Sequence, residues 1–253
     1  PYLYLISGKR DTTSRAHFYL TEWKLSSISS PHCCTFRPPV VLGCLRRLTQ
    51  LHLCYVWITG DELELLLSKS FTLECLRIAY CPEIIRVTIP CLLHRLNSLE
   101  VIDWDRLRAI ESNPPNLSSF RFEGFLVGLS FANLLLVKML EMSCIYHANV
   151  VSYARTKLPS MFPNVEALTI RSFDEVQSGT LDDYDHWYAY NYLEYNYFEA
   201  SLVQIDSTPM VPDKFLHLKY LHVCFAGRAF SPAYDYLSLV SFFDASPLLE
   251  TFI

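Results

Sequence analysis

The chain has 253 residues, of which 51% are hydrophobic and only 7 are glycine, as is typical of a folded protein rather than a disordered one. Its formal net charge of −5 does not favour nucleic acid, which needs a basic face, and no stretch approaches the roughly 20 apolar residues that cross a bilayer. The 9 cysteines form no pair of CxxC motifs, so we expect no zinc module and a reducing compartment, the cytosol or the nucleus.

The first 40 residues match the pattern of the remaining chain poorly. They include an apolar stretch from Tyr2 to Ile6 and the adjacent Cys33 and Cys34. We interpret residues 1–40 as a degraded repeat, an alternative exon or the product of a faulty gene model. We expect residues 41–253 to form one repeat domain, truncated at its C-terminus because the pattern stops in mid-repeat at Ile253.

An L-x-x-L-x-L motif, in which Val, Ile, Phe or Met replaces some leucines, recurs along residues 41–253. Complete motifs begin at Leu48, Leu73, Leu96, Leu117, Val137, Val165 and Leu218, and Leu249 with Phe252 opens one more. Most starts are roughly 20 to 29 residues apart, which is the length of a leucine-rich repeat. The longer interval between Val165 and Leu218 predicts one repeat that carries an insertion.

The two closely spaced apolar residues of each motif predict a short strand whose side chains point inward. Because one coil cannot bury its own apolar edge, successive coils must stack. The sequence therefore predicts an α/β fold, a leucine-rich-repeat solenoid. We expect a curved parallel sheet on its concave side, with short helices, strands and loops on its convex side.

The segments between the motifs predict the convex side. A helix is expected to begin at residues 60–62, capped by Asp61, with one apolar face made by Leu63, Leu66 and Leu67. Residues 85–89 alternate like a strand, and residues 90–96 suggest a short helical turn after a proline. Cys81 lies where many repeats place Asn or Cys to bind loop carbonyl groups.

The sequence resembles the repeat domain of plant F-box/LRR proteins, particularly the large grass group. The matching stretches are residues 60–81, 89–102, 113–120, 153–170, 208–223 and 230–253. In that family an F-box near the N-terminus docks on the Skp-type adaptor of a cullin ubiquitin ligase, and the repeats are thought to select the protein substrate. No F-box is visible in this chain. The resemblance therefore implies that adaptor and cullin bind only through an F-box outside it.

Outward-facing strand residues are the first candidate for partner binding. The predicted concave site consists of Gln50, His52, Arg77, Glu100, Arg121, Glu141, Thr169, Tyr220 and His222. Four of these alternate in charge along neighbouring strands, so they can pair across strands. Two interpretations stay open, a solvated face held by cross-strand pairs and a mixed-charge surface that binds a protein. A phosphate-rich ligand is disfavoured because acids interrupt the basic residues.

The insertion at about residues 173–208 is the second candidate. It holds eight acidic residues and no Lys or Arg. Its predicted partner-binding residues are Tyr184, Trp187, Tyr188, Tyr190 and Tyr192. Tyrosine and tryptophan are common binding anchors, and the acids favour a basic partner, although a variable loop of no function is an alternative. Asp182, Asp183, Asp185 and His186 resemble a cation cluster, but such clusters are usually solvated, and we expect no metal.

No catalytic motif is present in the sequence. It lacks a Gly-x-Ser-x-Gly elbow, an HExxH motif and a glycine-rich phosphate loop, and its 8 histidines have no catalytic spacing. We therefore predict a non-catalytic protein-binding domain without a cofactor, the substrate-recognition part of an SCF-type ubiquitin ligase. The alternative is a repeat scaffold or an immune-receptor-like fragment with no coupling to a ligase.

Overall fold

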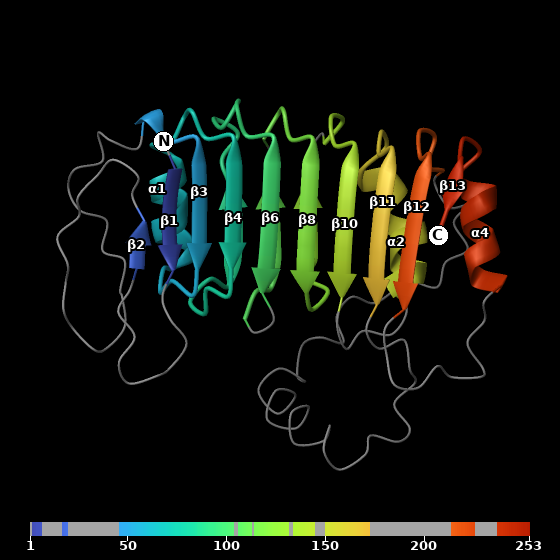
Figure 1. The fold of residues 1–253 in the computed structure, drawn as a ribbon, viewed down its shortest axis with the longest axis horizontal. Coiled ribbons are helices and arrows are strands. Elements are labelled where there is room, and N and C mark those ends of the chain that lie inside the picture. Colours follow the sequence, from blue (N-terminus) through green and yellow to red (C-terminus); the bar gives the residue numbers. More distant parts are fainter. Residues whose placement is uncertain are drawn as a thin grey trace, which may run out of the picture.

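The structure is a computed structural model in which coils stack along one axis (Figure 1). It describes residues 2–6, 17–19, 46–103, 106–112, 114–131, 134–144, 150–172, 214–225 and 237–253. Each coil of the repeat contributes one strand to a long sheet, and the chain then returns on the other side. The predicted α/β leucine-rich-repeat architecture is confirmed.

The main sheet has 10 strands in the order β13-β12-β11-β10-β8-β6-β4-β3-β1-β2. Its strands are β1 (Tyr2–Ile6), β2 (His17–Tyr19), β3 (Gln50–Cys54), β4 (Cys75–Ala79), β6 (Ser98–Asp103), β8 (Ser119–Gly124), β10 (Met139–Cys144), β11 (Ala167–Ser172), β12 (Tyr220–Phe225) and β13 (Thr251–Phe252). Every strand of this sheet except β2 is parallel to its neighbouring strands. Strand β2, at one edge, pairs antiparallel with β1. β11 pairs directly with β12, so the motifs on either side of the predicted insertion lie on neighbouring strands, and residues 173–208 themselves lie outside the described part of the chain.

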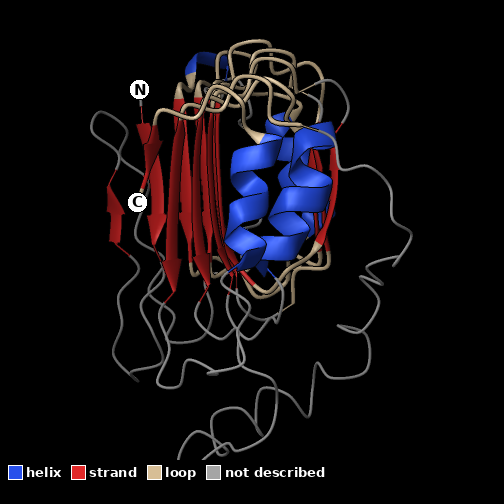
Figure 2. Cartoon of the chain, turned by 90° about the vertical axis from the view of Figure 1, so that its right-hand side faces the viewer, coloured by secondary structure: helices blue, strands red, loops and turns tan. Residues whose placement is uncertain are grey.

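The convex side combines helices with a second, smaller sheet. The three parallel strands β5 (Arg86–Ile89), β7 (Ala109–Ser112) and β9 (Gly128–Phe131) form this sheet. The helices α1 (Gly60–Leu67), α2 (Val150–Met161) and α4 (Leu237–Ala245) lie on one side of the main sheet (Figure 2). The opposite side of that sheet is therefore open to a partner in the described part of the chain.

The core lies between the two sides of the solenoid. In strands β3 to β11 the two inward residues of each motif are buried, for example Leu99 at 1% exposure and Val101 at 0%. Phe252 was expected to point inward in the same way, but 40% of it is exposed. It lies on β13, the last strand of the sheet, so a neighbouring strand covers it from one side only.

Polar bonds between coils lie in the turns that precede the strands. The backbone N–H of Asn97 donates to the carbonyl of Glu74 at 2.9 Å, and that of Ser118 donates to Asn97 at 2.9 Å. Amide side chains add to this ladder, because Asn116 Nδ2 donates to the carbonyl of His94 at 2.6 Å and Asn164 Nδ2 donates to that of Leu135 at 2.8 Å. These bonds hold the start of each strand at the same height, which fixes the strand register.

Two local predictions for the convex side need correction. Helix α1 buries Leu63, Leu66 and Leu67 as expected, but Thr59 caps it instead of Asp61, because the Thr59 hydroxyl accepts from the N–H of Glu62 and the Glu62 carboxylate accepts from the N–H of Thr59. Residues 90–96 form turns rather than a helical segment. The strand expected at 85–89 is present as β5, although its first predicted residue, Ile85, is 57% exposed and lies outside it.

A candidate protein-binding surface on the concave sheet

The outward residues predicted from the sequence form a continuous row. Cα pairing joins, in order, His52, Arg77, Glu100, Arg121, Glu141, Thr169 and His222, one from each strand from β3 to β12. Gln50 and Tyr220 lie in a parallel row at the start of the strands, where they pair with Cys75 and Ala167. The strand register therefore brings these predicted residues onto one face.

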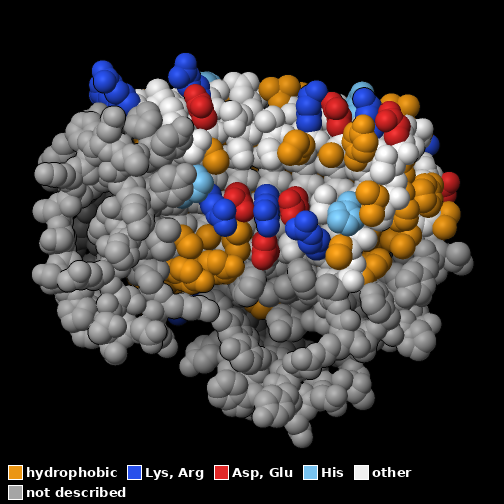
Figure 3. Space-filling model, viewed as in Figure 1, with side chains coloured by type: hydrophobic (Ala, Val, Ile, Leu, Met, Phe, Trp, Pro, Cys, Tyr) orange, Lys and Arg blue, Asp and Glu red, His pale blue; other side chains and the backbone are white. Residues whose placement is uncertain are grey.

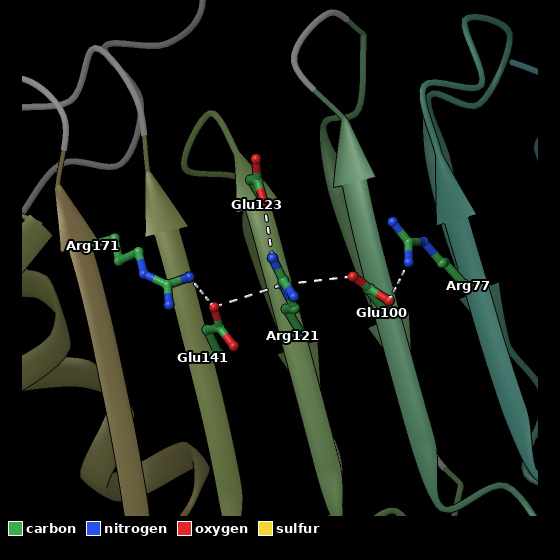
Figure 4. Close-up of polar contacts among 6 residues, drawn as sticks. All are labelled: Arg77, Glu100, Arg121, Glu123, Glu141 and Arg171. Atoms are coloured by element: carbon green, nitrogen blue, oxygen red, sulfur yellow. Dashed lines mark hydrogen bonds and ion pairs between the residues drawn. The ribbon is translucent and has the colours of Figure 1, made fainter. Parts of the chain in front are cut away.

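Ion pairs cross this row from strand to strand (Figure 4). Arg77 Nη1 lies 3.4 Å from Glu100 Oε2, and Arg121 Nε lies 3.5 Å from Glu100 Oε1 and 3.7 Å from Glu141 Oε1. Glu141 also pairs with Arg171. Since neighbouring parallel strands lie about 4.8 Å apart, an alternation of charge along the row lets every member reach its neighbour.

Two members of the network were not predicted from the sequence. Glu123 accepts from Arg121 at 3.3 Å, and Arg171 bonds to Glu141. Both lie on the next outward position of their strands, two residues beyond the predicted row, so the period of two along a strand was the signal that could have found them. We call Arg77, Glu100, Arg121, Glu123, Glu141 and Arg171 the concave charge network.

The network is half-buried and unevenly connected. Its side chains are 19% to 43% exposed, with Glu100 the least and Arg77 the most exposed. Arg121 contacts three carboxylates, whereas Arg77 and Arg171 each pair with one among the residues that the structure describes. An arginine with a single described carboxylate partner therefore stands at each end of the concave charge network, Arg77 at one end and Arg171 at the other.

Apolar and titratable side chains border the network. Met139 and Tyr220 are 59% and 50% exposed at the start of their strands. Burial, and then the positive charge of Arg77, lower the pKa of His52, so this imidazole is predominantly neutral at pH 7. Figure 3 shows the row of alternating charges with hydrophobic side chains around it. Such a mixture of aromatic, aliphatic and charged groups is typical of protein interfaces.

The other sequence-predicted sites have no counterpart in the described residues. Tyr184, Trp187, Tyr188, Tyr190 and Tyr192 lie outside them, as do Asp182, Asp183, Asp185 and His186. Within the described ranges there is no group of three or more His, Cys, Asp or Glu residues that could hold a metal ion. None of the described helices is long and apolar enough to cross a membrane.

Comparison with known protein families agrees with this geometry. The model of the At1g61320/AtMIF1 family, LRR domain, matches residues 20–199 and 193–253. The chain belongs to this LRR family. No curated protein and no solved structure matches the chain.

As an LRR domain, the chain is a protein-binding repeat domain, because stacked repeats create extended concave surfaces that bind partners. The family match begins at residue 20 and so includes half of the segment that fits the repeat pattern poorly. Within residues 1–40, strand β1 pairs in register with β3: Leu3 lies opposite Leu51, and Leu5 lies opposite Leu53. The sequence pattern did not reveal this strand of the LRR sheet.

Proposed function

We propose that the concave charge network is the partner-binding surface of this LRR domain. The observation that carries the proposal is the strand register, which gathers six charged side chains from β4, β6, β8, β10 and β11 into one half-exposed row. The mixed signs suit a protein partner that presents both acids and bases, and they do not suit a polyphosphate.

Binding would begin at the two ends of the concave charge network. Arg77 and Arg171 are 43% and 37% exposed and each pairs with one described carboxylate, so their guanidinium groups retain donors for acids of a partner. In the middle, Glu100 and Arg121 are held in place by their mutual contacts. A preorganised row loses little side-chain entropy when a partner binds, which favours specific recognition.

We further propose that the domain selects the substrate of an SCF-type ubiquitin ligase in the cytosol or the nucleus. The resemblance to F-box/LRR proteins supports this role, and the six described cysteines are free thiols, which agrees with a reducing compartment. The Skp-type adaptor and the cullin would bind through an F-box outside residues 1–253. The domain itself would contribute recognition and no catalytic step.

Charge reversal with a matched control tests the binding surface. Arg77→Glu on the concave sheet is compared with Arg106→Glu away from it, since Arg106 is 60% exposed and also pairs with one described carboxylate, Glu83, at 3.8 Å. Proteins captured from cells of the source organism are quantified for each variant. We expect Arg77→Glu to lose partners that Arg106→Glu retains. Equal capture by the two variants would reject the concave surface.

Ligase coupling needs a separate experiment. The natural full-length protein is purified from its own cells beside a protein restricted to residues 1–253. We expect a Skp-type adaptor to accompany the first in stoichiometric amount and to be absent from the second. If the adaptor accompanies neither, the domain is a scaffold without ligase coupling.

A further inference from the structure

Two tyrosines at the ends of neighbouring strands have an unusual backbone conformation. Tyr55 follows β3 with a φ of 56°, and Tyr80 follows β4 with a φ of 52°. In the described part of the chain they are the only non-glycine residues with positive φ. Bulky side chains avoid this left-handed region because Cβ approaches the following carbonyl oxygen. Strain of this kind is a reason to look for a function.

The two rings form a stack at the ends of β3 and β4. Their centroids are 4.8 Å apart and their planes differ by 14°. The backbone N–H of Tyr55 donates to the carbonyl of Ala79 at 2.9 Å, and that of Tyr80 donates to Ile102 at 2.8 Å. Equivalent bonds in consecutive coils thus place the rings one strand spacing apart. Both side chains are partly exposed.

The solenoid does not require aromatic residues at this position. The register assigns Asp103, Gly124, Cys144 and Ser172 to the equivalent position of the next four strands. Those coils close without a ring, and Gly124 is the only one of the four with positive φ. Phe225 occupies the position on β12, so what distinguishes β3 and β4 is the stacked pair of rings on neighbouring strands.

Tyr80 follows Arg77, one end of the concave charge network, by three residues, directly after β4. Burial raises the pKa of both tyrosines, so they keep their hydroxyl protons at neutral pH. The charges of Glu123 and Arg77 act on the Tyr80 hydroxyl in opposite directions. Cys54, which directly precedes Tyr55, is partly exposed. The stacked rings and the exposed guanidinium group of Arg77 therefore belong to the same pair of neighbouring strands, β3 and β4.

We propose that Tyr55, Tyr80 and Arg77 form a subsite for an aromatic side chain followed directly by an acidic residue in the partner protein. The proposal rests on the concave binding function proposed above. The partner's ring would pack on the tyrosine stack, and its carboxylate would pair with Arg77. A basic residue in place of the acid would meet the positive charge of Arg77, which is 43% exposed.

A short fluorinated peptide tests this subsite without a known partner. The probe is acetyl-glycyl-fluorophenylalanyl-aspartyl-glycine amide, and the readout is broadening of its fluorine NMR signal by the full chain. Tyr55→Asn with Tyr80→Asn removes both rings while supplying a residue that tolerates positive φ. Tyr55→Phe with Tyr80→Phe is the matched control that keeps the rings.

We expect the wild type and the phenylalanine pair to broaden the signal equally, and the asparagine pair to bind roughly three- to tenfold more weakly. The melting temperature of the asparagine pair should stay within about 3 °C of the wild type, since relief of strain offsets the lost ring contact. Replacing the peptide's Asp with Lys, or Arg77 with Gln, should reduce binding by a similar factor.

Equal broadening by wild type and the asparagine pair, no broadening by the wild type, or tighter binding of the lysine peptide would each overturn the proposal. These outcomes are separate from those of the partner-capture experiment. Partners lost in Arg77→Glu but retained in the asparagine pair would leave the concave surface in place and remove only the aromatic subsite.

Discussion

Arg121 on β8 lies beside Glu100 on β6, with 3.5 Å between Arg121 Nε and Glu100 Oε1. This contact joins the Arg77 end of the concave charge network to the Arg171 end. Arg121 is thus the centre of the network, because it also reaches Glu123 at 3.3 Å and Glu141 at 3.7 Å. The charges of the concave face form one connected unit.

Removing the central arginine should destabilise the fold more than removing a terminal one. Arg121→Gln leaves three half-buried carboxylates close together without their common partner, and we expect it to lower the free energy of unfolding by about 1–2 kcal/mol. Arg77→Gln leaves one carboxylate that still contacts Arg121, and we expect a loss below about 1 kcal/mol. Urea denaturation measures both. Equal midpoints for the two variants would show that the network is not centred on Arg121.

The stacked core predicts a large cost for truncating Leu99. The Leu99 side chain is 1% exposed between neighbouring coils. In the strand register Leu99 lies opposite Leu76 on β4 and Phe120 on β8. Leu99→Ala should lower the free energy of unfolding by about 2–5 kcal/mol through lost burial and a cavity. A melt followed by circular dichroism measures the shift, and an unchanged transition would remove Leu99 from the core.

Gly124 at the end of β8 should tolerate no side chain. Its φ is 153°, and a Cβ there would lie 1.8 Å from the carbonyl oxygen of Asp103 on the adjacent strand. Gly124→Ala should therefore cost more than about 2 kcal/mol or prevent folding. Gly128→Ala is the matched control, since its Cβ would lie 3.5 Å from the carbonyl oxygen of Arg108, which is an ordinary packing distance. Similar stability of the two variants would contradict the close approach of Gly124 to Asp103.

Buried thiols should resist alkylation. Burial raises the pKa of Cys81 and of Cys144 to about 12, so neither forms an appreciable amount of thiolate, the reactive species, at pH 8. Cys91 is exposed. Iodoacetamide at pH 8 should modify Cys91 before Cys81 and Cys144, and all three thiols should react in urea. Peptide mass spectrometry measures the extent of modification at each cysteine. Early labelling of Cys81 in the folded protein would contradict its place inside the coil.

The register of the concave sheet was predictable because the L-x-x-L-x-L motif fixes which residues point inward. Once Leu76 and Leu99 are aligned, Arg77 and Glu100 must be neighbours. Arg171 and Glu123 were missed because the prediction took the outward positions at the start and middle of the strands and stopped two residues short of them. Strand β1 was missed because about two repeat lengths separate Tyr2 from the next motif, so no spacing connects them.

Other features depend on contacts that no local pattern encodes. Tyrosine favours strands, so the positive φ of Tyr55 and Tyr80 could not be inferred from residue type. Helix α2 was not predicted, because Pro159 lies inside it and proline ordinarily breaks a helix. At Thr59 the capping box was visible in the sequence as Thr-x-x-Glu, and the choice of Asp61 overlooked it.

Site-specific photo-crosslinking tests the binding face most directly. A benzoylphenylalanine replaces Thr169, which lies on the concave row of β11, or Glu64, which is exposed on α1 of the convex side. We expect protein adducts in cell extract from position 169, a marked loss of these adducts when Arg77→Glu is added, and few from position 64. Adducts that form equally from both positions and are insensitive to Arg77→Glu would contradict a concave binding surface.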